Sequence, residues 1–423
     1  MADAAVAQIV SEPVQTTRAW PLPLRVSFRF AACYWLLYAF PEPGRSDLLD
    51  TIPGAEHVTK PYVDMWHAIV PWVAVHVFHV TGRPATYFPT GSGDTTLQYI
   101  QTLLYVVVAL AATLVWSVLD RRRTNYRNLH GWLRLLVRYT LAFTLFSYGF
   151  AKVFPLQFQP PSFGRLVETY GDFSPMGVLW SFMGTSLAYT IFAGSSEVLG
   201  GLLLLFRRTA SLGALVSFAV MTNVAALNYC YDVPVKLYST HLALMAVFLL
   251  IPDLHRLANV LVLNRASEPV EFSEPTFANR RLRIGVTVFW VLFVGFNLFE
   301  HVRGGWETYQ SFYIKAERPP IYGLYDVESG PPNWSKFYAQ RTNFLGVRTA
   351  EGKVLTFQTK YAKDTVTLDK DTLTWSRPDA GHVVLQGTLN GAATTIRLRA
   401  IDVNKFLLVN RGYHWINEVP FNR

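Results

Sequence analysis

The sequence is poor in cysteine and in charged residues. Its 423 residues include two cysteines, Cys33 and Cys230, which lie far apart and form no CxxC pair. It therefore lacks the pattern of a thioredoxin-like dithiol or of a cysteine zinc site. Charged residues make up 16% of the chain and hydrophobic residues 51%, whereas ordinary soluble domains carry about 25% charged residues. This deficit predicts that much of the chain lies in hydrocarbon.

The formal net charge of +9 raises the alternative of a nucleic-acid partner. Many arginines, however, stand in short loops between apolar runs, as is typical of membrane proteins. No nucleic-acid recognition motif accompanies them, so we expect no such partner. The first apolar run, which follows Pro21 and Pro23, has no small-residue cleavage site. We therefore expect a retained membrane anchor and not a removed signal peptide.

Seven apolar runs have, or nearly have, the roughly 20 residues with which a helix crosses about 30 Å of hydrocarbon. They are residues 24–40, 97–119, 132–153, 188–206, 209–229, 236–252 and 283–302. The sixth and seventh are short or bounded by charge. The runs predict a polytopic α-helical membrane protein with about seven spans.

Basic residues are concentrated in alternate connections between these runs. They are Arg121, Arg122, Arg123, Arg127, Arg207, Arg208, Arg256, Arg265, Arg280, Arg281 and Arg283. Because cytoplasmic loops of membrane proteins are rich in lysine and arginine, this pattern predicts a cytoplasmic N-terminus. Residues 41–96 and 304–423 are then outside the cytoplasm.

Residues 62–79 are apolar enough to resemble a further span, but Pro71 interrupts them. A crossing here would move the arginine-rich loops to the wrong side, so we expect an amphipathic helix on the outer surface. The same interpretation applies to residues 176–187. Acidic and histidine side chains in residues 62–79 also suggest a metal site as an alternative: they are Asp64, His67, His76 and His79. Pro71 separates the two pairs and no cysteine assists, so we expect no metal.

The glycine-containing string TGSGDTT at 90–96 raises the alternative of a phosphate-binding loop. No P-loop or dinucleotide fingerprint surrounds it. A tight loop that caps the following span explains the string, with Asp94 or Thr95 as the N-cap residue.

From about residue 304 the apolar pattern changes to alternation with period two. Strands are predicted at residues 321–327, 337–349, 353–362, 365–369, 372–377, 382–390 and 393–402. Asn390-Gly391 and Glu351-Gly352 are turn signals between such runs. We expect an antiparallel β-barrel or sandwich that folds by itself. The aromatic tail at 411–423 is expected to pack on that domain or on the membrane surface.

Glu197 lies in the middle of an apolar run, where an ionisable side chain costs about 2.5–3.5 kcal/mol. Small residues surround it, and Ser196 and Gly200 have the spacing that favours close helix packing. Further polar groups fall in the same half of the predicted bilayer: Lys152, Asn223, Asn228, Asp232, Lys236 and His241. The first interpretation is a polar pocket, with Glu197 and His241 transferring protons and the others binding a ligand. The second is a fixed network in which Glu197 pairs with a lysine and the asparagines bond between helices.

The stretches RYTLAFTLFSYGFAKVFP, SSEVLGGLLLLFRRTASLGALV and NYCYDVPVKLYSTHLALMAVFLLIPDLHRL carry a family resemblance. Together they resemble the DoxX-like membrane family, with GxxK ending the first helix of a four-helix core, a glycine-rich second helix and a basic turn. The N-terminal part is similar, more faintly, to the membrane domain of vitamin K-dependent carboxylases. The expected domains are an N-terminal membrane region with external loop (1–131), the DoxX-like bundle (132–265), a linker with the last span (266–303) and an external β-rich domain (304–423).

The resemblance implies a bacterial protein of the cytoplasmic (inner) membrane whose bundle binds a quinone-like apolar molecule in support of membrane redox chemistry. Some members of the family are associated with quinol-linked redox enzymes, and others with chaperone or cargo-handling roles. The alternative is therefore a non-enzymatic membrane chaperone or lipid-handling protein with an external lipid- or protein-binding β-domain. Membrane lipid, a quinone and a periplasmic protein are the expected partners. The resemblance assigns no catalytic residues.

Overall fold

A computed structural model describes residues 19–40, 52, 54–88, 90–270, 275 and 277–421. The chain forms two compact units. The first comprises Met1–Thr144, Leu203–Phe218 and Thr240–Phe289, and the second comprises Leu145–Leu202, Ala219–Ser239 and Trp290–Arg423.

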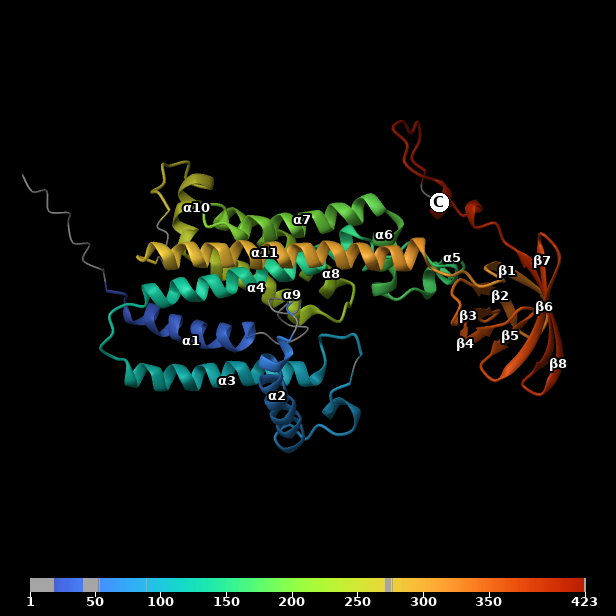
Figure 1. Ribbon diagram of the computed structural model, residues 1–423, viewed down its shortest axis with the longest axis horizontal. Helices are drawn as coiled ribbons and strands as arrows, with labels where there is room; N and C mark the ends of the chain where they lie inside the picture. The colour runs from blue at the N-terminus through green and yellow to red at the C-terminus, as the bar shows by residue number, and fades with distance from the viewer. Residues whose placement is uncertain are drawn as a thin grey trace, which may run out of the picture. The chain divides into compact units, whose positions relative to one another are not determined.

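All seven predicted spans are helical (Figure 1). The helices are α1 (Leu22–Ala39), α3 (Thr96–Leu119), α4 (Arg127–Val153), α7 (Leu187–Leu205), α8 (Ala210–Cys230), α9 (Lys236–Leu250) and α11 (Arg280–Tyr309). Within the described residues, five helical segments are long and apolar enough to cross a membrane: Thr96–Leu119, Leu187–Leu205, Ala210–Cys230, Lys236–Leu261 and Arg280–Ile314. Neither α1 nor α4 is among them; α1 contains two arginines, and α4 contains three arginines and a lysine. A count of seven spans stays a prediction.

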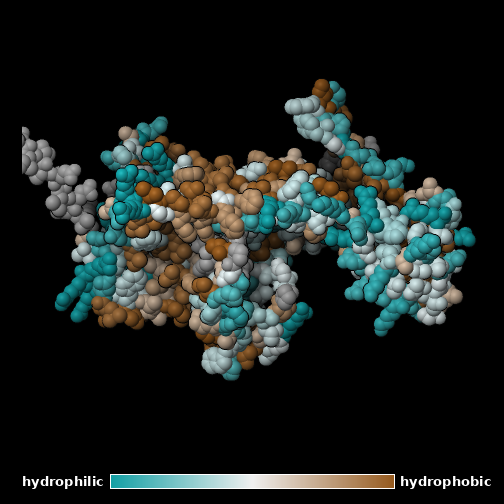
Figure 2. Space-filling model, viewed as in Figure 1, coloured by the Kyte–Doolittle hydropathy of each residue, from teal (hydrophilic) through white to brown (hydrophobic). Residues whose placement is uncertain are grey.

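The outer surface of the helices is strongly apolar, as Figure 2 shows in brown. On α3 and α11 large aliphatic and aromatic side chains are exposed over much of the helix length: Leu103, Val107, Leu110, Leu114, Val118, Val288, Leu292, Phe296 and Phe299. Such a surface is costly in water and favourable in lipid. The helices therefore have the apolar outer surface that is typical of a membrane protein.

The shorter helices also lie close to the predicted positions. α2 (Glu56–His76) covers most of the expected surface helix, and its Trp66 ring packs edge-on against Tyr105 of α3 at 4.8 Å. Figure 1 shows α2 running across α3, while much of its remaining surface is exposed and apolar. α6 (Pro175–Thr185) matches the second expected surface helix. Their position on a bilayer surface stays a prediction.

The glycine-containing loop before α3 is a helix cap, as predicted. Thr95 is the N-cap residue, and its side chain accepts a hydrogen bond from the Gln98 backbone N–H. The Gln98 side chain accepts one from the Thr95 N–H, which completes a capping box. Asp94, the other candidate, lies one residue before the cap.

The C-terminal strands form a closed antiparallel barrel in the order β1 to β8, so the alternative of a sandwich is wrong. They are β1 (Gly323–Ser329), β2 (Trp334–Ala339), β3 (Phe344–Thr349), β4 (Val354–Tyr361), β5 (Thr365–Leu368), β6 (Asp371–Asp379), β7 (His382–Leu389) and β8 (Ala392–Ala400). The single strand predicted at 337–349 is wrong. Its polar centre, residues 340–343, connects β2 to β3, which pair with Tyr338 opposite Gly346. Asn390 and Gly391, with φ of 50° and 81°, make the predicted turn between β7 and β8.

Side chains fill the interior of the barrel. Its core consists of apolar residues from every strand: Ile321, Tyr325, Phe337, Ala339, Leu345, Val347, Val366, Leu368, Leu373, Val383, Leu385, Leu389, Ile396 and Leu398. Eight strands enclose a space of about the width that side chains fill. Because the apolar side faces inward and charged groups face outward, this is a water-facing domain.

In the described part of the aromatic tail, residues 411–421, large side chains are strongly exposed. Trp415 is 89% exposed and Tyr413 76%. Arg411 donates a hydrogen bond to Asn417 Oδ1 at 2.8 Å and stacks over the Phe421 ring. Contact of the tail with the barrel or with a membrane surface stays a prediction.

Candidate functional site

The candidate site begins at a close contact between α4 and α7. A methyl group placed on Gly194 would lie 2.5 Å from the carbonyl oxygen of Gly149 and 2.7 Å from Lys152 Cβ. Real Cβ atoms do not approach other atoms so closely, so glycine at both positions lets the helix backbones touch. Each glycine stands three residues before a charged residue, Gly149 before Lys152 and Gly194 before Glu197.

This contact brings Lys152 and Glu197 together. Lys152 Nζ lies 2.9 Å from Glu197 Oε2, and the two side chains are 7% and 2% exposed. The pairing that the sequence suggested is therefore present, although the predicted small-residue spacing at Ser196 and Gly200 is not what forms it. A buried pair of this kind contributes little net stability by itself, because both ions lose their hydration.

The hydrogen bonding of this pair is incomplete among the described residues. Lys152 Nζ has three protons, and it donates to Glu197 Oε2 and to the Tyr148 carbonyl oxygen at 3.3 Å. Glu197 accepts only the lysine bond, which leaves its second oxygen without a donor. One ammonium proton and one carboxylate oxygen are thus available to a further polar group. A further polar group that reached the pair would complete this hydrogen bonding.

Aromatic rings flank the ammonium group. Lys152 Nζ lies 5.6 Å from the Tyr148 ring centroid and 6.0 Å from that of Phe158. Tyr148 also packs against Tyr238, and Phe158 against Trp180 of α6, at 5.9 and 5.1 Å. Aromatic side chains therefore lie beside the charged pair, and a planar ligand could pack against them.

The remaining predicted ligand-binding residues of this unit are not joined to the pair. Asn228 is buried and donates to Ser239 Oγ at 3.0 Å, as the network interpretation expected of an asparagine. Lys236 pairs with Asp232 at 2.8 Å across the turn between α8 and α9, and the Asp232 side chain is 83% exposed. Asn223 is exposed. These contacts assign no chemistry, and the ligand-binding roles stay predictions.

His241, the second predicted catalytic residue, belongs to the first compact unit. It is buried, and its ring stacks on Tyr38 at 4.1 Å with an interplanar angle of 5°. Its Nε2 lies 2.5 Å from the hydroxyl of Tyr34. Both tyrosines come from α1. These two tyrosines are not predictable from the sequence, because nothing in a single sequence shows which helix faces His241.

Two further buried networks in the first unit were also missed. Asp253 accepts hydrogen bonds from Ser211 Oγ and Arg256, both at 2.6 Å, and lies 3.7 Å from Arg134. The second network surrounds Arg29 and is described below. Two arginines and a hydroxyl group surround the Asp253 carboxylate. The carboxylate is therefore fully engaged, and this network fixes helix ends.

No metal centre is present in the described residues, where no three histidine, cysteine or acidic side chains cluster. His67 packs against the Tyr87 ring at 4.1 Å, and His76 stacks on Trp72 at 4.8 Å. Both cysteines are free thiols.

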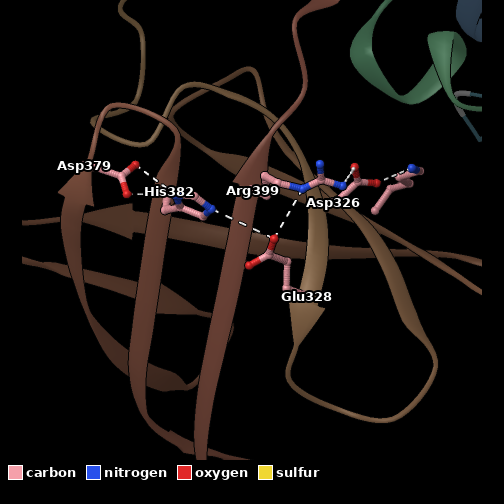
Figure 3. A network of polar contacts seen from close by, with 6 residues as sticks. Asp326, Glu328, Asp379, His382 and Arg399 are labelled. Atoms are coloured by element: carbon pink, nitrogen blue, oxygen red, sulfur yellow. Dashed lines mark hydrogen bonds and ion pairs between the residues drawn. The ribbon is translucent and has the colours of Figure 1, made fainter.

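The barrel carries a ladder of alternating charges on its outer face (Figure 3). Asp326 of β1 bonds to Arg399 of β8 at 3.1 Å and also to Lys336 of β2. Arg399 reaches Glu328 at 3.3 Å. His382 of β7 lies between Glu328 and Asp379, and its Nδ1 is 2.8 Å from Asp379 Oδ1. That hydrogen bond, together with one from the Gly381 N–H, lowers the pKa of Asp379. The charges of the ladder are thus paired with one another.

The barrel also contacts the chain that follows α4. Arg348 of β3 forms a 2.6 Å ion pair with Asp172 Oδ2. The Gln340 side chain accepts a hydrogen bond from the Phe163 N–H at 3.1 Å, and the Phe163 ring packs against Tyr322 at 5.2 Å. Residues 155–173, which come directly after Lys152 and α4, are thereby connected to the barrel.

No family model matches the chain, and no solved structure matches it. A curated protein of Bacillus subtilis (strain 168), described as "Uncharacterized protein YwoB", is 35% identical over 136 residues. The match covers 32% of this chain and 82% of YwoB. With most of that relative covered at this identity, the chain belongs to the same family as YwoB.

Proposed function

We propose that the crossing of α4 and α7 binds the polar head of a quinone-like apolar molecule, in support of membrane redox chemistry. The observation that carries this proposal is the incomplete hydrogen bonding of the buried Lys152–Glu197 pair. In an apolar helix pair such vacancies are costly. A head group with both a donor and an acceptor fills them.

The pair suits both redox states of such a molecule. The Lys152 ammonium group donates a hydrogen bond to the carbonyl oxygen of a quinone. The free oxygen of Glu197 accepts a hydrogen bond from the hydroxyl of a quinol, and on oxidation it takes one of the two protons released, while the second passes to water at the membrane surface. The two electrons pass to a partner redox protein, as the DoxX-like resemblance implies. Tyr148 and Phe158 favour a planar head group, since aromatic rings pack well edge-on or offset-stacked.

In the proposed arrangement the N-terminus lies in the cytoplasm of a bacterium and the barrel lies outside the inner membrane. The arginine-rich connections support this orientation. The barrel is then available to a periplasmic partner, and its contacts with residues 155–173 connect it to the chain beside Lys152. Labelling of an engineered cysteine at Thr388 in intact spheroplasts tests the orientation, and protection of that cysteine contradicts it.

Ligand titration of the full-length protein in nanodiscs tests the binding proposal. A short-chain ubiquinone or menaquinone analogue should quench tryptophan fluorescence in the wild type. Glu197→Gln and Lys152→Met should each weaken the quenching by about tenfold or more, since a charge-assisted hydrogen bond contributes about 1.5–3 kcal/mol. Glu300→Gln is the matched control, because Glu300 pairs only within its own helix, with Arg303 at 2.9 Å. Equal affinities in all four proteins would contradict the proposal.

The alternative function is lipid or protein handling by the barrel. The filled interior gives no support to a lipid held inside it. The exposed aromatic tail does favour contact with a lipid surface or a client protein. A mass-spectrometric inventory of co-purified molecules separates the two functions. Bound quinone supports the first, and phospholipid or a client protein without any redox-active molecule supports the second.

A further inference from the structure

A cavity of about 640 Å³ lies at the start of α1, in the first compact unit. Ala19, Trp20, Pro21 and Arg127 line it. The Trp20 N–H donates a hydrogen bond to the Thr124 carbonyl oxygen at 2.9 Å, which ties the segment before α1 to the α3–α4 loop. Figure 2 shows hydrophilic side chains gathered where α1 begins and α3 ends.

One arginine lines this cavity, and two more belong to the α1 start and the α3–α4 loop beside it. Arg127 lines it directly. Arg25 donates a hydrogen bond from Nη1 to the Arg123 carbonyl oxygen at 2.8 Å, and Arg123 donates from Nε to the Asn125 carbonyl oxygen at 3.3 Å. In the part of the chain that the structure describes, none of the three forms a salt bridge. The nitrogen Nε of Arg25 is buried and also lacks a hydrogen-bond acceptor there.

The nearby carboxylate of Asp120 is already engaged. Asp120 Oδ2 accepts hydrogen bonds from the Tyr126 hydroxyl at 3.0 Å and from Trp116 Nε1 at 3.4 Å. A fourth arginine, the buried Arg29, is held by neutral atoms: Tyr126 Oη, Ser117 Oγ and the Asp120 carbonyl oxygen. Its charge adds to that of the three exposed or half-buried arginines. The region is therefore strongly positive, which favours an anion.

The surroundings of the cavity indicate an anion that carries acyl chains. Trp20 packs edge-on against Phe28 at 5.5 Å and His130 at 6.0 Å, and tryptophan is typical of the membrane–water interface. Leu22 and Leu24, next along α1, are exposed. An apolar surface thus adjoins the charged one.

We propose that this cavity binds the phosphate headgroup of an anionic membrane phospholipid. Arg127, Arg123 and Arg25 supply charge-assisted donors to the phosphate, and arginine matches phosphate geometry well. The exposed leucines of α1 contact the acyl chains. This site is separate from the Lys152–Glu197 pair and does not depend on the function proposed for it.

Native mass spectrometry of the full-length protein with equal amounts of phosphatidylglycerol and phosphatidylcholine tests the proposal. The wild type should retain phosphatidylglycerol preferentially. Each arginine near an anionic lipid contributes about a fivefold preference, so Arg123→Gln with Arg127→Gln should reduce the preference about 30-fold. Replacing both with lysine should keep most of it. Arg281→Gln, at the start of α11 and outside the cavity lining, is the matched control.

Four outcomes overturn the proposal. The first is an undiminished preference in the double glutamine variant, and the second is an equal loss in the Arg281→Gln control. The third is displacement of phosphatidylglycerol by millimolar inorganic phosphate, which would assign the cavity to a free anion. Should the glutamine variant not fold, the wild type itself still decides. Raising the salt concentration must weaken its retention of phosphatidylglycerol, and an unchanged retention also overturns the proposal.

Discussion

Removing one partner of the Lys152–Glu197 pair should destabilise the protein far more than removing both. The atoms Nζ and Oε2 are 2.9 Å apart and almost fully buried. At an effective dielectric constant of about 20, their attraction is roughly 6 kcal/mol. The loss of hydration on burial, several kcal/mol for each ion, offsets most of it. The net contribution of the intact pair is therefore small.

The single variants do not share this balance. Glu197→Gln leaves a buried ammonium group without its counter-charge, and Lys152→Met leaves a buried carboxylate. Each should lower the free energy of unfolding by about 3–5 kcal/mol. The double variant has no isolated charge and should lie within about 2 kcal/mol of the wild type. The coupling energy of the cycle then measures the interaction.

Unfolding by increasing mole fractions of sodium dodecyl sulfate, followed by circular dichroism, gives these free energies for the full chain. If both single variants unfold like the wild type, water already reaches the pair and the reasoning is refuted. If the single variants lose stability but still bind the quinone analogue, the pair is a structural network. The cycle therefore separates the two interpretations of Glu197.

Three further predictions concern other positions. Gly194→Ala should lower the free energy of unfolding by about 1–3 kcal/mol, because the added methyl group meets the Gly149 backbone. The same detergent unfolding measures this change. Gly285→Ala is the control and should have little effect, because the space around Gly285 is open. Asp379 has a lowered pKa, so its stabilising effect is complete above its ordinary pKa of about 4 and is lost as the pH falls through the lowered value. The difference in proteolysis of the barrel between wild type and Asp379→Asn should therefore shrink below about pH 4, and a constant difference would contradict this. Gly391→Ala should destabilise the β7–β8 hairpin by about 1–2 kcal/mol, because the backbone φ at Gly391 is 81°. The barrel of the full-length variant should then be proteolysed faster than that of the wild type. An unchanged rate of proteolysis argues against backbone strain at this position.

Much of the helical architecture was predictable because apolar runs of span length leave few alternatives in a membrane protein. The helix boundaries lie within a few residues of the runs, except in α4 and α11, which continue into charged sequence. Strand patterns are weaker signals. The run at 337–349 alternates across a polar connection of four residues, and alternation alone does not reveal a reversal of direction.

The candidate site was predictable only in part. The isolated charges of Lys152 and Glu197 made their pairing an expected outcome, because each needs a partner in hydrocarbon. The glycines that form the contact, Gly149 and Gly194, stand in the GxxK pattern and among the small residues around Glu197, but the close packing was predicted from Ser196 and Gly200 instead. The stacking of His241 on Tyr38 depends on how α1 packs in three dimensions, which helical periodicity in one chain does not specify.

The closed order of the barrel restricts how the C-terminal domain can recognise another protein. β1 pairs with β8 as well as with β2, so none of the eight strands leaves a row of backbone N–H and C=O groups unpaired. Recognition by strand addition, in which an extended peptide joins the edge of a sheet, is therefore closed to this domain unless a strand is first displaced. A protein that docks on the barrel must read side chains or the loops between strands. Its specificity would then reside in shape and charge and not in the backbone.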